Sequence, residues 1–495
     1  MTPVERSSGA SSATVQWTSI DWESIESAVF RLQLRIAKAA REKRWGKVTA
    51  LQRLLTRSYS AKLLAVKRVT QNKGRRTPGV DGVTWKTAKQ KWESSMALSC
   101  HGYKSHPLRR IYIPKKNGKL RPLGIPTMFD RAMQALFLSA VEPVAEVTAD
   151  VHSYGFRPKR STADAIERCF VVLAKKTSAH WILEGDIKGC FDHISHDWML
   201  THLPLEKKIL KQWLKAGFIE NHQRHATISG TPQGGIISPC LSNLVLDGLE
   251  VMLKNMTKQP DKVHLIRYAD DFVITSSSKE LLVTKIKPAV TAFLQERGLS
   301  LSEEKTLITS MDQGFDFLGF NVRKYNNKLL IKPSKSSIKS FLTIIKEAIK
   351  LSVSTPTIQI IRSLNRKIEG WVNYYRSVVS KQAFSYVDSA IFRSLYRMLR
   401  KRHPRKSAKW IYRRYYTNRG MRRWLFHACY WNRDGERAAL MLKLASDTPI
   451  RRHRQILSAA TPYDIEHLEY FILRARKVKQ GFSTTGSFYD GLMTA

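Results

Sequence analysis

Cysteines, acidic residues and long apolar runs are all scarce in this sequence of 495 residues. The five cysteines are odd in number and scattered, and none forms a CxxC pair, which argues against a disulfide framework or a zinc ribbon. No run of about 18 apolar residues could span a membrane. No apolar stretch follows Arg6 near the N-terminus, so a secretory signal is not expected. These absences favour a reducing, cytoplasmic setting without a membrane partner.

Basic residues greatly outnumber the acidic ones. Lysine and arginine total 84 against 40 acidic residues, which gives a formal net charge of +44. A charge this large opposes compaction unless a polyanion neutralises it, and counterion release from phosphates drives such binding. A basic surface that serves only solubility is an alternative, although a surface of mixed sign would serve as well. The composition indicates a nucleic acid partner.

The chain is long enough for about three domains, and its patterns change along its length. The first residues lack hydrophobic periodicity, whereas the stretch from Trp22 to Val69 predicts two helices. A hairpin is predicted around Asn117-Gly118, and strand signals fade after Lys335. We divide the chain into a disordered tail, an N-terminal helical extension, a mixed region, a helical domain and a C-terminal segment: 1–15, 16–70, 71–330, 331–445 and 446–495.

Adjacent carboxylates stand at the tip of a second predicted hairpin. Asp270 and Asp271 are flanked by apolar runs within residues 263–275. Burying two carboxylates side by side is costly unless cations neutralise them, and oxygen ligands suit Mg²⁺. A solvated Asp-Asp turn is the alternative for this pair alone. Asp186 ends another strand-like run, and a cluster of all three would suit phosphoryl transfer with two metal ions.

Eight motifs occur in the order found in reverse transcriptases of group II introns, and residues 20–475 resemble that family. The motifs are TPGVDGVT (77–84), IPKKNGKLRPLGIP (113–126), SYGFRPKRSTADAI (153–166), GDIKGCFDHI (185–194), GTPQGGIISP (230–239), RYADDFVI (267–274), GLSLSEEKT (298–306) and FDFLGF (315–320). The resemblance implies an α+β right-hand polymerase, with fingers and palm built on antiparallel sheet in residues 71–330. A helical thumb and maturase domain would follow in residues 331–445, and a DNA-binding-like segment in residues 446–495.

The resemblance also implies roles for individual residues. Asp186, Asp270 and Asp271 would be catalytic and, with the backbone carbonyl of Ile187, would hold two Mg²⁺ ions, or Mn²⁺ in their place. Five residues would contact the incoming nucleotide: Lys115, Arg121, Phe191, Gln233 and Lys305.

Each nucleotide contact has a simpler alternative. Lys115 and Arg121 flank a hairpin turn and suit a triphosphate, but a solvated hairpin also carries such cations. Phe191 would exclude a 2′-hydroxyl, whereas most phenylalanines only pack a core. Gln233 lies among glycines that permit close backbone approach. Lys305 could equally be an ordinary surface lysine.

A strongly basic span follows in the helical domain. Residues 391–425 hold thirteen Lys or Arg and no Asp or Glu, interleaved with aromatic residues. The cations would bind RNA phosphates and some aromatics would stack on bases, although the aromatics could all be core. Trp371, Tyr374 and Tyr375 are expected to pack helices. The predicted RNA-binding residues are Arg397, Arg400, Lys401, Arg402, Arg405, Lys406, Lys409, Arg413 and Arg414.

The resemblance predicts an RNA-directed DNA polymerase that binds its intron RNA as a splicing maturase and copies it by target-primed reverse transcription during retrohoming. Its partners would be the group II intron RNA, target DNA and dNTPs, in the bacterial cytoplasm and associated with the nucleoid. The alternatives are an RNA-binding splicing chaperone with a vestigial polymerase and a domesticated reverse transcriptase in a defence system. The tail after Gly481 lacks cysteine, so the HNH endonuclease of many relatives is not expected.

Overall fold

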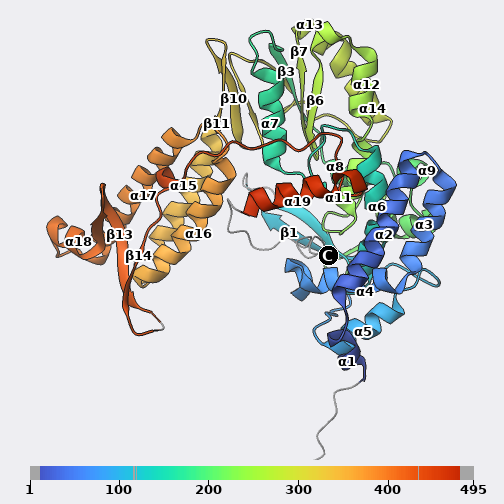
Figure 1. Cartoon of the computed structure of the whole chain (residues 1–495), viewed down its shortest axis with the longest axis horizontal. Helices are drawn as coiled ribbons and strands as arrows, with labels where there is room; N and C mark the ends of the chain where they lie inside the picture. The colour runs from blue at the N-terminus through green and yellow to red at the C-terminus, as the bar shows by residue number, and fades with distance from the viewer. Residues whose placement is uncertain (1–11, 115–117, 119, 433, 480–495) are drawn as a thin grey trace, which may run out of the picture.

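The computed structural model describes residues 12–114, 118, 120–432 and 434–479. Figure 1 shows the N-terminal helices on one side of the molecule and the C-terminal helices on the other, with a sheet of long strands between and above them. No helix in the described part of the chain is long and apolar enough to cross a membrane.

Within the described residues, the N-terminal region contains five α-helices. They are α1 (Ser12–Thr18), α2 (Trp22–Arg41), α3 (Trp45–Arg57), α4 (Tyr59–Gln71) and α5 (Ala88–Ala97). The prediction of two helices between Trp22 and Val69 was wrong, because Ser58 ends α3 and caps α4 by accepting a hydrogen bond from the Ala61 amide. The prediction of a tail through residue 15 was also wrong, because α1 begins at residue 12 and Trp17 packs edge-on against Trp22.

The first sheet has the strand order β2-β1-β4-β5. The predicted hairpin is confirmed: β1 (Leu108–Pro114) pairs antiparallel with β2 (Leu120–Ile125), and β1 also pairs in parallel with β4 (Phe218–Glu220). Strand β5 (Gln223–His225) completes the sheet. Lys115 in the β1–β2 turn lies outside the described residues.

The central sheet is antiparallel, with the order β6-β7-β3-β8. Its strands are β3 (Trp181–Asp186), β6 (His264–Tyr268), β7 (Asp271–Ser276) and β8 (Leu307–Ser310). The adjoining helices are α6 (Met128–Thr148), α7 (Thr162–Leu173), α8 (Cys190–His193), α9 (His196–His202), α10 (Lys207–Leu214), α11 (Ser238–Leu246), α12 (Leu249–Met256), α13 (Lys279–Leu281) and α14 (Lys287–Gln295). Most of α6 is buried, so this helix ties the N-terminal helices and the central sheet into one hydrophobic core.

The C-terminal domain begins with a hairpin sheet and continues in long helices. Strands β9 (Phe315–Phe317), β10 (Phe320–Tyr325) and β11 (Lys328–Pro333) form the sheet. The helices are α15 (Lys335–Lys350), α16 (Thr357–Tyr375), α17 (Lys381–Arg402) and α18 (Ala408–Tyr415). Tyr374 and Tyr375 donate hydroxyl hydrogen bonds to the carbonyls of Leu318 and Gly319, which confirms their predicted packing role.

The C-terminal domain is not wholly helical, which corrects the prediction for residues 331–445. A sheet of β12 (Tyr416–Arg419), β13 (Arg422–Trp431) and β14 (Arg437–Met441) follows α18. Its arginines obscure the strand pattern in the sequence, but Tyr416, Leu425 and Phe426 are buried beneath it. Burial of these apolar side chains against the domain core stabilises the strands.

The last described residues pass from the C-terminal domain back to the N-terminal helices, shown in red in Figure 1. The Arg451 amide bonds to the Arg376 carbonyl, and Asp464 forms an ion pair with Arg41 of α2. Helix α19 (Ile465–Lys479) follows. Asp164 in the first turn of α7 anchors this segment, accepting bonds from His453, Ile456 and Arg474.

Candidate active site

Two of the three predicted catalytic acids lie side by side on neighbouring strands of the central sheet. In the register of β3 with β7, Asp186 pairs with Asp271, and Tyr268 of β6 pairs with Asp271 on its other side. Asp270 occupies the turn between β6 and β7, as the hairpin pattern predicts. Ala269 enters this turn with a φ of 58°, a left-handed conformation that is unfavourable for alanine. The turn is therefore held in place by its surroundings.

The acids repel one another at this site. Partial loss of hydration, followed by the charges of Asp270 and Asp186, raises the pKa of Asp271 to about 7, although its side chain stays open to solvent. The same loss of hydration and the charge of Asp186 raise the pKa of Asp270. A nearby cation stabilises the charged form of carboxylates that repel one another in this way.

A lysine supplies such a cation. The Lys305 ammonium lies 2.7 Å from Asp186 Oδ2, and this hydrogen bond raises the pKa of Lys305. Among the residues that the structure describes, no three His, Cys, Asp or Glu side chains are spaced to hold a metal ion. The structure thus pairs two of the acids and places the third beside them, with the amine of Lys305 on Asp186.

Two glycines let neighbouring groups approach the acidic hairpin closely. A Cβ on Gly185, one residue before Asp186, would lie 2.2 Å from the ring of Phe272. A Cβ on Gly155 would lie 2.3 Å from the Ala269 amide nitrogen. Backbone hydrogen bonds join the Gly155 loop to β6, from Tyr154 to the Arg267 carbonyl and from the Arg267 amide to the His152 carbonyl. These contacts hold the turn at Ala269 in its left-handed conformation.

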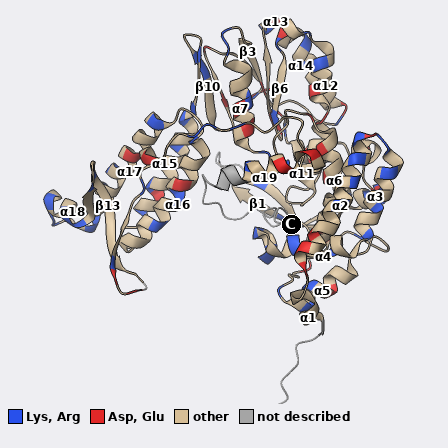
Figure 2. Cartoon of the chain, viewed as in Figure 1, with Lys and Arg blue, Asp and Glu red and all other residues tan. Residues whose placement is uncertain are grey.

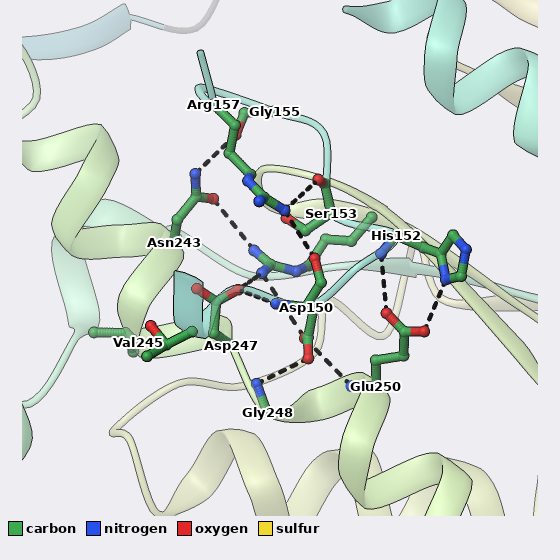
Figure 3. Close-up of polar contacts among 12 residues, drawn as sticks. Asp150, His152, Ser153, Gly155, Arg157, Asn243, Val245, Asp247, Gly248 and Glu250 are labelled. Atoms are coloured by element: carbon green, nitrogen blue, oxygen red, sulfur yellow. Dashed lines mark hydrogen bonds and ion pairs between the residues drawn. The ribbon is translucent and has the colours of Figure 1, made fainter. Parts of the chain in front are cut away.

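A network of buried charges lies behind the hairpin (Figure 3). The Arg267 side chain is fully buried and forms ion pairs with Asp247 and, at 4.0 Å, with Asp150. It also bonds to Asn243 Oδ1 and lies 3.5 Å from the Ala269 carbonyl oxygen. Sequence reasoning did not identify this network. Its only local signal is an arginine beside Leu265 and Ile266 in a strand that is mostly apolar.

Strand β2 of the first sheet contacts the loop before α11 near the acids, and the charge of Arg121 acts on Asp270. Arg121 Nε on β2 donates a 2.6 Å hydrogen bond to Gln233 Oε1, and Gln233 Nε2 lies 3.3 Å from the carboxylate of Asp192. The Gly124 amide bonds to the Gln233 carbonyl. Two predicted nucleotide contacts, Arg121 and Gln233, are therefore hydrogen-bonded to each other. Asp192 belongs to the same hydrogen-bond network, and the sequence analysis did not predict its participation.

Phe191 and Ile187 lie on the segment after β3. Phe191 is 8% exposed, and its carbonyl accepts a bond from the Thr231 amide. Ile187 forms an isolated bridge with Leu301, flanked by hydrogen bonds from Ser302 to the Asp186 carbonyl and from Lys188 to the Ser300 carbonyl. Neither of these bonds uses the Ile187 carbonyl.

Comparison with known proteins identifies the family. Residues 113–322 match the model for reverse transcriptase (RNA-dependent DNA polymerase), residues 17–98 the N-terminal domain of reverse transcriptase, and residues 338–416 the group II intron maturase-specific domain. The chain is 30% identical over 441 residues to the group II intron-encoded protein LtrA of Lactococcus lactis subsp. cremoris, covering 69% of this chain and 72% of LtrA. The chain belongs to the group II intron-encoded reverse transcriptases and maturases.

Other similarities are more partial. Protein YkfC of Escherichia coli strain K12 is 34% identical over 314 residues, covering 54% of this chain and 82% of YkfC. The telomerase of Candida albicans, solved with a fragment of telomeric RNA, aligns with a TM-score of 0.36 and 11% identity over 62% of this chain and 64% of that chain. A similarity this low does not bear on function.

The basic span of this reverse transcriptase lies at the α17–α18 end of the C-terminal domain, where the ribbon in Figure 2 is blue at Lys and Arg positions. Eight of the nine predicted RNA-binding residues are exposed there: Arg397, Arg400, Lys401, Arg405, Lys406, Lys409, Arg413 and Arg414. Arg402 is the exception, because it is only partly exposed. Its guanidinium donates to the carbonyls of Ser352, Val353 and Thr355, so it holds the loop after α15.

Most aromatics of this span pack against one another. Tyr412 stacks on Tyr396 with ring centres 5.5 Å apart and contacts the Trp424 ring at 4.5 Å. Tyr416 is 6% exposed, whereas Trp424 is 51% exposed. The structure therefore favours the core role for these aromatics, with Trp424 as the exposed exception among those named here.

Proposed function

We propose that this chain synthesises DNA on an RNA template at a site formed by Asp186, Asp270 and Asp271. The observation that carries the proposal is the pairing of Asp186 with Asp271 across β3 and β7, with Asp270 on the adjoining turn. Acidic groups that repel one another at an open position are the arrangement needed for cations and a polyphosphate substrate. The central sheet would be the palm, and the first sheet the fingers.

Divalent cations fit these residues in donor chemistry. The available donors are carboxylate oxygens and the Ile187 carbonyl, which suit Mg²⁺, with Mn²⁺ as a substitute. The contact of the Lys305 ammonium with Asp186 supports this assignment, because it places a positive charge against one of the three acids. Two such ions, when bound, would polarise the primer 3′-hydroxyl and neutralise charge on the leaving pyrophosphate.

The surrounding side chains would select and orient the nucleotide. Arg121, together with Lys115, would bind the triphosphate from the fingers side, and Gln233 keeps Arg121 beside the site through their 2.6 Å bond. Phe191 would lie beneath the sugar and exclude a 2′-hydroxyl. Lys305 would leave Asp186 and bind a phosphate once other cations occupy the acids.

The second activity that we propose is binding of the group II intron RNA through the exposed cations of residues 397–414. Thirteen basic residues without an acidic one in residues 391–425 support this role, because phosphate contacts dominate RNA affinity. Binding of intron RNA would promote its splicing, and the same chain would copy the RNA into DNA from a primer at the target DNA. We expect this to take place in the bacterial cytoplasm, at the nucleoid.

The deciding experiment is extension of a DNA primer on an RNA template by the purified chain, with and without Mg²⁺, for wild type and Asp270→Ala. Wild type should make complementary DNA only with the ion, and Asp270→Ala should make none. Asp197→Ala, an exposed aspartate of α9, is the matched control and should retain activity. Absence of extension by wild type, with RNA binding intact, would refute the polymerase proposal.

A further inference from the structure

Phe156 is a large aromatic residue in an unfavourable backbone conformation. Its side chain is 55% exposed and its φ is 58°. The left-handed region costs a residue with a Cβ roughly 1 kcal/mol or more, and exposure of a phenylalanine ring gains no burial energy. Packing of the Phe156 ring in the protein core does not explain either feature.

The residues on both sides of Phe156 are anchored to the buried network (Figure 3). The Gly155 carbonyl accepts a 2.8 Å hydrogen bond from Asn243 Nδ2. The Arg157 guanidinium bonds to Glu146 Oε1 at 2.8 Å and to the carbonyls of Asp150 and Ser153. The backbone is thereby held in the left-handed conformation, and the Phe156 ring is presented at a fixed place.

That place adjoins the acids. A Cβ added to Gly155 would lie 2.3 Å from the Ala269 amide nitrogen, so Phe156 follows a residue that packs closely against the acidic turn. The Phe156 ring centre lies 6.3 Å from the ring centre of Phe191, with the planes at 75°. This is an edge-to-face aromatic pair, a favoured arrangement that fixes the orientation of both rings.

We propose that Phe156 and Phe191 together form the wall that meets the nucleotide sugar, and that Phe156, by holding the Phe191 ring, determines how strongly ribonucleotides are rejected. This inference rests on the proposed polymerase function. Without Phe156, the Phe191 ring would lose this edge-to-face partner and could turn away from an added 2′-hydroxyl. With Phe156 against it, that movement is blocked.

The test compares incorporation of a single dNTP and the matching rNTP on an RNA template with a DNA primer, for wild type, Phe156→Ala, Phe191→Ala and the double variant. Alanine keeps the Cβ of phenylalanine, so the backbone strain at residue 156 is unchanged. Phe170→Ala on α7, another exposed phenylalanine away from the acids, is the matched control.

Phe156→Ala should raise the ratio of rNTP to dNTP incorporation by about tenfold, the size expected for loss of one apolar contact in a pocket. The double variant should show no larger ratio than Phe191→Ala, since residues that act as a unit are not additive. Phe170→Ala should keep the wild-type ratio.

A Phe156→Ala ratio within about twofold of wild type, while Phe191→Ala raises it tenfold, overturns the inference and leaves the polymerase proposal intact. A loss of primer-template affinity with an unchanged ratio also overturns it, because Phe156 would then contact nucleic acid elsewhere. If wild type extends nothing, the polymerase proposal fails and this inference falls with it.

Discussion

At the scale of single residues, the proposed role of Lys305 in nucleotide binding can be tested separately from its effect on stability. Its ammonium pairs with Asp186 at 2.7 Å, but 65% of its side chain is exposed. An exposed ion pair contributes at most about 1 kcal/mol. We expect Lys305→Ala to leave the melting temperature nearly unchanged and to raise KM for dNTP by about tenfold, which is roughly the loss of one charged contact. Steady-state primer extension and thermal unfolding measure the two effects, and an unchanged KM would remove Lys305 from the nucleotide site.

Gly155 is the second residue with a testable role. Because glycine has no side chain, the Ala269 amide can pack closely against Gly155. A Cβ at residue 155 would lie 2.3 Å from that amide nitrogen. We expect Gly155→Ala to displace the acidic turn and reduce the extension rate by at least about 100-fold, as small misplacements in an active site do. Rapid primer extension at saturating dNTP is the measurement.

The matched control for Gly155 is Gly370→Ala, in the interior of α16, where nothing lies within 4 Å of the added Cβ. This change should keep full activity and stabilise the helix by about 0.5–1 kcal/mol. Equal activity of the two variants would show that the Gly155 contact does not position the turn.

At the scale of elements, the buried ion pairs join β6 to the C-terminal end of α11 and to the segment after α6. Arg267→Met would leave Asp247 and Asp150 buried without their partner, which typically costs about 3–5 kcal/mol. We expect a marked fall in the urea midpoint of unfolding. Asp247→Asn in the same chain should recover part of the loss by removing one stranded charge.

Arg422→Met is the control for this prediction, because its ion pair with Asp447 is half exposed on both sides. It should change the free energy of unfolding by less than about 1 kcal/mol. If Arg267→Met lowers the free energy of unfolding no more than Arg422→Met does, the buried ion pairs do not stabilise the packing of these elements.

The contact between Glu250 of α12 and His152 should stabilise the fold less at low pH. Burial alone would raise the pKa of Glu250, but hydrogen bonds from His152 and Lys254 outweigh it and hold the pKa at about 2. A folded pKa below the unfolded one contributes stability above about pH 4.5, and this contribution is lost as the pH falls toward 2. Glu250→Gln should therefore lower the melting temperature near neutral pH and much less near about pH 3. Glu303→Gln, an exposed glutamate, should show no such pH dependence.

At the scale of the whole molecule, the net charge of +44 predicts RNA binding that weakens steeply with salt. Replacing Arg405, Lys406 and Lys409 with glutamine should lower the slope of log Kd against log salt by about 2, since each phosphate contact to a single strand contributes about 0.7. Filter binding of intron RNA over a salt series measures the slope. The control neutralises three exposed lysines near α12 and α14, Lys258, Lys285 and Lys287. An equal change of slope in the control would mean that total charge, and not the position of residues 405–409, determines RNA binding.

The sequence by itself determined the features that are local along the chain. The acids lie at strand ends because apolar runs precede Asp186 and surround Asp270 and Asp271, and these runs also predicted the β6–β7 hairpin correctly. The helical character of the region after Lys335 was also predicted, although the β12–β14 sheet within it was not. Composition alone indicated the nucleic acid partner.

Only the tertiary structure decided what depends on residues distant in sequence. In the folded chain, the Arg402 side chain bonds to the loop after α15, and Arg121 bonds to Gln233. Gln233 in turn lies beside Asp192, and the Phe156 ring packs against Phe191. Folding also formed the β12–β14 sheet, whose strands gain stability from the core beneath them. Hydrogen bonds, ion pairs and ring contacts of this kind form between segments brought together by folding, so they leave no periodic pattern in the local sequence from which they could be predicted.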